Sequence, residues 1–312
     1  MVVVIVPALN EEKTIGTVIS DIPRDVVDIV KVVVIDDGST DDTVKAAKDA
    51  GADEVISFRK NKGLAEAFRK GLDVALEMGA DIVVNIDADG QYQANEIPQL
   101  IKPILDEVAD MVLGSRFKGW IEEMPIQKRI GNKIATKVTA LASGYPVSDA
   151  QTGFRALSRE AALRLNILSN YTYTQETIVQ AARKGLRIVE VPCTFRKRVG
   201  KSRLITNIFS YARRGGLVIL TTYRDYKPLK TFMIVGVLLL VVGLSAGLRV
   251  LVHYLATGMV TPYLPTAVLT GVLLIVGFQV VILALIADMI GSNRKLMEEI
   301  LYRIKKRNHP RS

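Results

Sequence analysis

Residues 82–91 read IVVNIDADGQ, a short apolar run that ends on two carboxylates, Asp87 and Asp89. Such a run is typical of a buried strand, and the acids that follow it then stand at the edge of a sheet. Mg²⁺ and Mn²⁺ prefer oxygen ligands, and a carboxylate pair in this place can hold an ion that bridges a diphosphate. A chain of this Asp content contains about one Asp-x-Asp by chance, so solvated loop acids are the alternative interpretation.

A second acidic turn favours the metal site. Residues 36–39 read DDGS and also follow a strand-like run, Lys31 to Ile35. The open edge of an α/β sheet is where such folds bind their ligands. The two turns together therefore indicate an enzyme.

Strand-like and helix-like stretches alternate through the first half of the chain. In order they are Val2 to Val6, Lys13 to Ile22, Lys31 to Ile35, Thr43 to Ala50, Glu54 to Phe58 and Gly63 to Glu77. This alternation predicts an α/β fold, a Rossmann-like, mostly parallel sheet with helices on both faces. Neither G-x-G-x-x-G nor G-x-x-x-x-G-K occurs, so the dinucleotide and P-loop motifs are absent.

The alternation of strand-like and helix-like stretches is less regular after residue 91. We expect a helix over Glu96 to Glu107, a strand over Met111 to Gly114 and a helix over Tyr173 to Lys184. A further helix begins at Lys128 and Arg129, although cations at a helix start oppose the helix dipole. They are predicted either to face an anion or to form a solvated basic face.

The last third of the chain is apolar enough to cross a bilayer. Thr231 to Leu248 (18 residues) and Tyr263 to Ala287 (25 residues) carry no charge. The chain starts directly on a Val-rich run without a signal peptide, so the first domain is expected to stay in the cytoplasm. Cys193 is the sole cysteine, which excludes an internal disulfide and predicts a core position.

Charge divides along the same line as hydropathy. Residues 1–190 carry 23 Lys and Arg against 28 Asp and Glu, a net −5, whereas residues 191–312 carry 18 against 4, a net +14. Basic residues beside a membrane span usually mark its cytoplasmic side and favour anionic lipid head groups. We therefore expect the lipid bilayer as a partner and no nucleic acid.

These observations predict four segments. Residues 1–200 form the catalytic domain, 201–230 a juxtamembrane amphipathic helix and basic linker, 231–290 a two-helix transmembrane hairpin, and 291–312 a basic cytoplasmic tail. Apolar residues recur at helical spacing from Leu204 to Ala212, and the linker Tyr254 to Pro262 is uncharged. The expected location is the cell membrane, with two spans and both termini in the cytoplasm.

Six motifs, in order and spacing, resemble the family 2 glycosyltransferases of GT-A fold, and among them the dolichyl-phosphate or polyprenyl-phosphate hexose synthases. They are VIVPALNE (4–11), VIDDGSTD (34–41), NKG (61–63), DADGQ (87–91), GSR (114–116) and TGFR (152–155). The resemblance covers nearly the whole chain. It implies transfer of one hexose, with inversion, from a nucleotide sugar to a polyprenyl or dolichyl phosphate.

The resemblance also assigns roles to residues. For the nucleotide sugar it implies Pro7, Leu9, Glu11, Ile35, Asp37 and Lys62, with Asp87 and Asp89. For the metal, Mg²⁺ or Mn²⁺, it implies Asp87, Asp89 and Gln91. For catalysis it implies Asp89 and the phosphate-contacting cations Arg116, Lys128 and Arg198. The family usually has Arg where Lys128 stands, so Arg129 is an alternative to it.

Two features narrow the assignment within this family. Processive polysaccharide synthases of this superfamily carry Gln-x-x-Arg-Trp, whereas the one tryptophan here, Trp120, stands in a different setting. Two spans after the catalytic domain resemble the glucosyl branch, so glucose ranks above mannose and N-acetylglucosamine. The oligomeric state stays open, a homo-oligomer included.

Two other functions compete with the lipid-phosphate transferase. A transferase of the same fold that acts on a saccharide or protein hydroxyl needs a carboxylate base, and Glu176 or Asp149 could serve. A non-catalytic, membrane-anchored binder of sugar nucleotides is the third, and the intact Asp87, Asp89 and Gln91 count against it.

Overall fold

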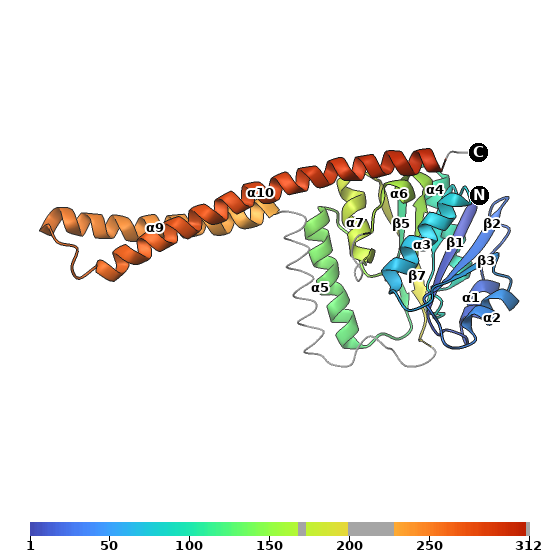
Figure 1. Cartoon of the computed structure of the whole chain (residues 1–312). Helices are drawn as coiled ribbons and strands as arrows, with labels where there is room; N and C mark the ends of the chain where they lie inside the picture. The colour runs from blue at the N-terminus through green and yellow to red at the C-terminus, as the bar shows by residue number, and fades with distance from the viewer. Residues whose placement is uncertain (168–172, 199–227, 310–312) are drawn as a thin grey trace. The chain divides into compact units, whose positions relative to one another are not determined.

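The computed structural model describes residues 1–167, 173–198 and 228–309. Of these, residues 1–198 and 301–309 form one compact unit, and residues 228–300 form a second. The first is built on a β-sheet and the second consists of two long helices (Figure 1). The amphipathic helix expected at 204–212 lies outside the described residues.

The sheet of the first unit has seven strands. They are β1 (Val2–Ala8), β2 (Val30–Asp36), β3 (Glu54–Ser57), β4 (Ile82–Asn85), β5 (Met111–Ile121), β6 (Arg155–Ser158) and β7 (Ile188–Phe195). Their order is β3-β2-β1-β4-β6-β5-β7, and β6 alone runs antiparallel to its neighbours β4 and β5. The prediction of a mostly parallel sheet is therefore confirmed.

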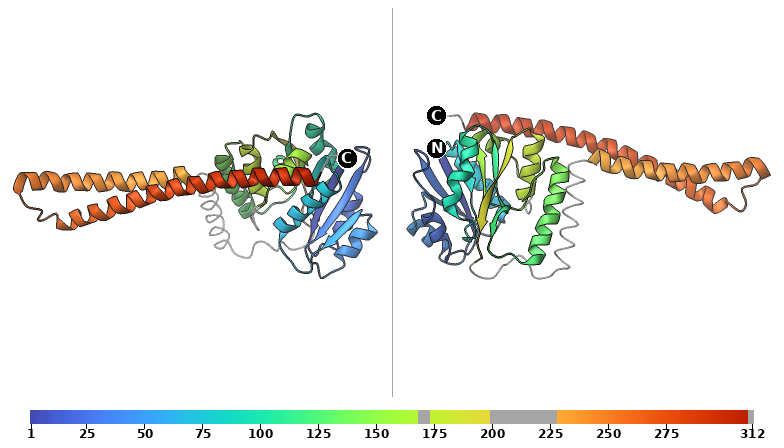
Figure 2. Two further views of the ribbon diagram at one scale, coloured as in Figure 1. Left: turned by 45° about the horizontal axis from the view of Figure 1, so that its top comes forward. Right: turned by 180° about the vertical axis from the view of Figure 1, so that it is seen from behind.

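Helices cover both faces of this sheet (Figures 1 and 2). They are α1 (Ile15–Ser20), α2 (Thr43–Asp49), α3 (Leu64–Glu77), α4 (Ile97–Leu105), α5 (Ile126–Ser143), α6 (Arg159–Arg164) and α7 (Tyr173–Arg183), with a short 3₁₀ turn at Ala94–Glu96. Val4 of β1 packs in the core with α1, α2 and α4, whereas its neighbour Ile5 packs in the core with α3, α6 and α7. Side chains alternate along a strand, so a strand covered on both faces must be apolar throughout, as β1 is.

The second half of the unit departs from the expected elements. The strand expected over Met111 to Gly114 extends to Ile121, because its far end pairs again with β7 after an irregularity. Strands β6 and β7 were not predicted from the pattern. β6 has four residues and begins on the buried Arg155, so it lacks the apolar signal of β1 or β4. Cys193 is buried, as expected.

The second unit contains α9 (Pro228–Thr257) and most of α10 (Leu264–Asn308). Both are long and apolar enough to cross a membrane, and an 18-residue stretch within each has a mean hydropathy of 2.4 in the first and 2.7 in the second. The two helices lie side by side (Figures 1 and 2), and glycines allow their close approach. A Cβ atom on Gly236 would stand 2.8 Å from Cγ2 of Val281, so a larger residue would push the helices apart.

The end of α10 belongs to the first unit. Tyr302 donates its hydroxyl to Glu160 of α6 at 2.9 Å, and the ammonium of Lys305 donates to the carbonyl oxygen of Leu165 at 3.4 Å. Arg159 donates to the carbonyl oxygen of His309 at 2.8 Å. Residues 301–309, which lie in the expected tail 291–312, thus pack on the sheet-containing unit. The expected boundaries at 200 and 230 lie in or near the undescribed residues and stay predictions.

Candidate active site

Three loops meet at one edge of the sheet. Strands β2, β1 and β4 are adjacent and parallel, so their carboxyl ends lie side by side. The loops that follow them contain residues 9–11, 37–39 and 86–91, which are the acidic and polar motifs of the sequence. An open α/β sheet binds ligands at this edge, because the loops diverge there and leave a crevice.

The carboxylates of Asp87 and Asp89 follow β4 at this edge. Asp87 is largely buried and close to Asp89, so burial, and then the neighbouring negative charge, raise its pKa to about 7. Asp89 lies 3.5 Å from the guanidinium of Arg198 and accepts a hydrogen bond from the backbone N–H of Gln91 at 3.1 Å. Two carboxylates in this environment favour a cation between them.

Gly153 lets the backbone pass close to the carboxylate of Asp87. A Cβ atom on Gly153 would stand 2.6 Å from Oδ2 of Asp87, so any other residue would displace the carboxylate. The side-chain amide of Asn85 donates to the carbonyl oxygen of Gly153 at 2.7 Å and fixes this part of the loop. The TGFR motif therefore contributes a close backbone approach to Asp87.

Gln91 connects the acidic loop to the segment after β7. Its amide nitrogen donates to the carbonyl oxygen of Arg196 at 3.2 Å, and the N–H of Arg196 donates to the carbonyl oxygen of Gln91 at 2.7 Å. The side-chain oxygen of Gln91 is then the atom suited to a metal ion. The same pair of bonds brings Arg198, which contacts Glu11 and Asp89, over the loop.

Three cations converge beside the carboxylates. The guanidinium of Arg116 lies 5.0 Å and the ammonium of Lys128 5.6 Å from the ring centroid of Phe195. Burial, and then the charge of Arg116, lower the pKa of Lys128, while Asp89 opposes that shift. Arg198 completes the group. These are the three cations that the resemblance assigned to phosphates.

Arg129 is not among the residues that the structure brings to the site. It follows Lys128 on α5, so the helix turns it by about 100° away from its neighbour. Its side chain is exposed, whereas that of Lys128 is half-buried and faces the acids. Of the two alternatives, Lys128 is the one that lies beside the carboxylates, and its contact with a phosphate stays a prediction.

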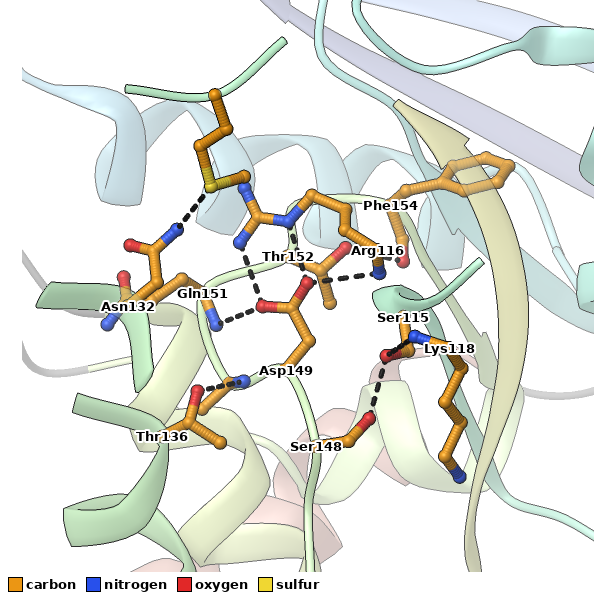
Figure 3. Close-up of polar contacts among 12 residues, drawn as sticks. Ser115, Arg116, Lys118, Asn132, Thr136, Ser148, Asp149, Gln151, Thr152 and Phe154 are labelled. Carbon is orange, nitrogen blue, oxygen red and sulfur yellow. Dashed lines mark hydrogen bonds and ion pairs between the residues drawn. The ribbon is translucent and has the colours of Figure 1, made fainter. Parts of the chain in front are cut away.

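Asp149 holds Arg116 in position (Figure 3). Its carboxylate accepts from Nε and Nη2 of Arg116 at 2.7 and 2.8 Å and from the backbone N–H of Arg116 at 3.1 Å. Glu190 of β7 in turn accepts from the backbone N–H groups of Ser148 and Asp149 at 2.7 and 3.2 Å. Asp149 is fully buried in this network.

The sequence did not reveal this role of Asp149. From the sequence, Asp149 was only a candidate base for a hydroxyl acceptor. Arg116 and Asp149 are 33 residues apart and meet because β5 and the loop before β6 lie side by side. A buried cation with fixed geometry needs a carboxylate partner, but the sequence offers many carboxylates and no spacing that selects this one.

We expect Asp149→Asn to lower the unfolding free energy by about 3 kcal/mol, because it leaves the buried guanidinium of Arg116 without a counter-charge. Asp110 offers a matched control, since its carboxylate also accepts two bonds from one guanidinium, that of Arg187. The Arg187 side chain is 56% exposed, so Asp110→Asn should have a much smaller effect. Pulse proteolysis of the full chain across a denaturant series measures both. Equal losses would contradict the assignment of a buried, structurally required pair.

The residues expected to bind the nucleoside have different environments. The carboxylate of Asp37 accepts from the backbone N–H groups of Lys62 and Gly63 at 2.7 and 2.9 Å, so it positions the NKG loop. The ammonium of Lys62 lies 4.5 Å from the ring centroid of Phe58. The side chain of Ile35 packs in the core, which leaves its main chain for any contact with a ligand.

The other expected residues follow β1. Pro7 is buried and pairs with Ile35 across the two strands, while Leu9 is half-buried. Glu11 accepts a hydrogen bond from Arg198, which lies 187 residues later in the chain. The roles of these residues in nucleotide binding stay predictions.

The donor set at this edge fits a divalent cation. Asp87, Asp89 and the amide oxygen of Gln91 would supply hard oxygen ligands. The pKa of Asp87 is raised by burial and then by repulsion from Asp89, and a cation would relieve that repulsion. We expect the affinity for Mn²⁺ to fall about tenfold per pH unit below pH 7, since the ion must displace one proton from Asp87. Above pH 7 the affinity should level off. Titration calorimetry from pH 5.5 to 8 tests this, and a flat profile would contradict it.

Comparisons with known proteins show which family this chain resembles. The profile of the family described as Glycosyl transferase family 2 matches residues 3–165. The chain is 32% identical to glycosyltransferase AglJ of Haloferax volcanii over 305 residues, which cover 96% of this chain and 97% of that protein. It is 35% identical over 216 residues to the UDP-N-acetylglucosamine–dolichyl-phosphate N-acetylglucosaminyltransferase of Methanococcus voltae, covering 62% and 84%.

A solved structure shows a likeness in fold as well. Glucosyl-3-phosphoglycerate synthase of Mycobacterium tuberculosis, in complex with Mn²⁺ and UDP-glucose, superposes with a TM-score of 0.55 at 28% identity, covering 71% of this chain and 78% of that one. The family profile covers more than half of the 312 residues, and one relative matches almost from end to end. The chain is a glycosyltransferase and belongs to glycosyl transferase family 2.

Proposed function

We propose that this glycosyltransferase moves one hexose from a nucleotide diphosphate sugar to the phosphate of a dolichyl or other polyprenyl phosphate. The observation that carries the proposal is the group of three cations, Arg116, Lys128 and Arg198, beside the carboxylates Asp87 and Asp89. A diphosphate donor and a phosphate acceptor both require positive charge, and this edge supplies it. The two helices that could span a membrane suit an acceptor that resides in the bilayer.

The proposed reaction needs no proton transfer. A phosphate monoester has a second pKa of about 6, so its oxygen is already anionic at neutral pH. That oxygen forms the new bond to the anomeric carbon on the face opposite the diphosphate, and the diphosphate leaves with the electron pair of the broken bond. The anomeric configuration is therefore inverted.

The residues of the chain then have two tasks. Arg116, Lys128 and Arg198 offset the repulsion between the two anionic reactants through charged hydrogen bonds. Asp87, Asp89 and Gln91 would hold Mg²⁺ or Mn²⁺, which supplies charge stabilisation for the departing diphosphate. Asp149 orients the guanidinium of Arg116.

A hydroxyl acceptor would need a carboxylate base, and neither candidate supports it. Asp149 is fully buried and engaged with Arg116. Glu176 of α7 is 7% exposed and accepts a hydrogen bond from Gln180 at 3.1 Å. A non-catalytic binder is disfavoured because the chain belongs to a glycosyltransferase family and keeps Asp87, Asp89 and Gln91.

We favour UDP-glucose as the donor, with UDP-N-acetylglucosamine and GDP-mannose as the alternatives. The uridine nucleotide is supported by the relative that is named for UDP-N-acetylglucosamine and by the superposed structure with UDP-glucose. Detergent-purified protein, incubated with each radiolabelled donor and polyprenyl phosphate, decides among them. A lipid-soluble labelled product supports the proposal, while transfer only to water-soluble hydroxyl acceptors would overturn it.

We further propose that the catalytic unit and both termini face the cytoplasm. Arg224, Lys227 and Lys230 precede the first apolar helix, cations recur at 294–307, and residues 254–262 between the helices carry no charge. Reporter fusions at residue 259 and at the carboxyl terminus should therefore report opposite sides of the membrane. A carboxyl-terminal fusion on the outer side would contradict the proposed orientation, and two fusions on the same side would mean that α10 does not span the membrane.

A further inference from the structure

Glu190 places a carboxylate in the interior of the protein, on strand β7. Ile188, two residues earlier on the same strand, packs in the core with α3, α6 and α7. Glu190 extends to the same face, because side chains alternate along a strand. Its side chain is only 2% exposed. Burial of a carboxylate costs free energy unless hydrogen-bond donors compensate it, so the donors around Glu190 show what it is placed to hold.

Four donors surround this carboxylate. Its Oε1 accepts from the backbone N–H and the hydroxyl of Ser148 at 2.7 and 3.0 Å, and from the backbone N–H of Asp149 at 3.2 Å. Its Oε2 lies 2.9 Å from the ammonium of Lys118, whose side chain is 48% exposed. Three of the donors belong to residues 148–149, so Glu190 fixes that segment, and Lys118 offsets the charge of Glu190 from the solvent side.

Residues 148–149 lie in the loop before β6, where neither a strand nor a helix fixes the backbone. A second contact joins this loop to β5, since the hydroxyl of Ser148 lies 2.7 Å from the hydroxyl of Ser115 (Figure 3). Ser115 directly precedes Arg116. Side chains therefore fix the loop at the point where it meets Arg116.

The orientation of Arg116 depends on this loop. Asp149 accepts from Nε and Nη2 of Arg116 at 2.7 and 2.8 Å, which engages one edge of the planar guanidinium. A guanidinium has five N–H donors, so the edge formed by Nη1 and Nη2 keeps donors for an anion. Because the group is rigid and planar, a shift of Asp149 would turn that second edge with it.

We propose that Glu190 is a positioning residue for sugar transfer, which acts through residues 148–149 to direct the Nη1–Nη2 edge of Arg116 at a phosphate. The inference rests on the proposed function, since it takes Arg116 as a cation that contacts a phosphate of the donor or the acceptor. A displacement of about 1 Å at a catalytic group can cost about a hundredfold in rate. Glu190 itself needs no contact with the substrate.

Two replacements of Glu190 distinguish positioning from general-base catalysis. Glu190→Ala removes the acceptor of both backbone N–H groups and should slow transfer by about tenfold or more. Glu190→Gln keeps an oxygen that can accept from both and loses only the ion pair with the exposed Lys118, so it should stay within about threefold of the wild-type rate. A Gln variant as slow as the Ala variant would overturn the proposal, because the loss would then follow the charge and not the loop.

A double-mutant cycle shows whether Glu190 acts through Arg116. In an Arg116→Ala background, Glu190→Ala should change the rate by less than about twofold, since no guanidinium is left to orient. Full additivity of the two losses would overturn the proposal. Asp110→Ala is the matched control, because the Asp110 carboxylate joins the other ends of β5 and β7 by accepting from the backbone N–H of Arg187 at 2.8 Å. It should change the rate by less than about twofold.

Arginine modification of the purified full chain tests the contact without an assay of transfer. Phenylglyoxal reacts with accessible guanidinium groups, and mass spectrometry of peptides resolves each site. Glu190→Ala should raise the modification rate of Arg116, which is 4% exposed, severalfold, while the fully buried Arg155 stays protected. Glu190→Gln and Asp110→Ala should keep the wild-type rate at Arg116.

An unchanged modification rate at Arg116 in Glu190→Ala would overturn the proposal, since the guanidinium would then be held without Glu190. A rise at Arg155 as large as that at Arg116 would also overturn it, because the whole unit would then be loosened. If wild-type protein transfers sugar to no polyprenyl phosphate, the proposed function fails, while the modification result still decides whether Glu190 holds Arg116.

Discussion

Asp89→Ala is expected to reduce transfer by about a thousandfold or more without unfolding the sheet-containing unit. A divalent cation supplies several kcal/mol of stabilisation to a departing diphosphate, and each 1.36 kcal/mol corresponds to about tenfold in rate. Asp89 is placed to be a ligand of that cation, and its side chain still reaches solvent with 15% of its surface, so water can fill the space that the truncated side chain leaves. The variant should also lower the pKa of Asp87, because the charge of Asp89 is one of the two causes that raise it.

The measurement is initial-rate transfer with saturating donor and Mn²⁺, with thermal unfolding of the same samples as a check on the fold. Asp49→Ala, at an exposed position near the end of α2, is the control and should change the rate less than about twofold. Full turnover by Asp89→Ala in excess chelator would end the metal hypothesis.

Arg198→Ala should slow transfer by about tenfold to more than a hundredfold. A charged hydrogen bond is worth about 1.5 to 3 kcal/mol, and Arg198 stands between Glu11 and Asp89 where both reactants need positive charge. Its neighbour Lys197 pairs instead with the exposed Glu123. Lys197→Ala removes a cation from the same segment without reaching the site, so it should change the rate less than about twofold.

Glu176→Gln distinguishes a phosphate acceptor from a hydroxyl acceptor. It keeps the shape of the side chain and removes only the carboxylate, so a mechanism without a general base should lose less than about tenfold. The reverse ranking, with Glu176→Gln nearly inactive and Arg198→Ala nearly normal, would favour a hydroxyl acceptor. Both variants are assayed with polyprenyl phosphate and with a soluble saccharide acceptor.

The local sequence pattern was enough to predict the first half of the fold and the acidic centre of the site. β1 and β4 are apolar on both faces because helices cover both, and such a run is visible in the sequence without any partner. The acids Asp87 and Asp89 follow their strand directly, so the edge on which they lie follows from the strand itself. The two long apolar helices could likewise be predicted from composition, because the thickness of a bilayer sets the length of an apolar run that can cross it.

Tertiary structure alone decided which distant residues meet. Arg116 pairs with Asp149, and Arg198 reaches Glu11 from 187 residues away, because strand order and not spacing brings them together. Which of Lys128 and Arg129 faces the carboxylates depended on how α5 is rotated against the sheet. These contacts are long-range and electrostatic, and charged residues are too common along the chain for a local pattern to select the pairs that packing brings within a few ångströms of one another.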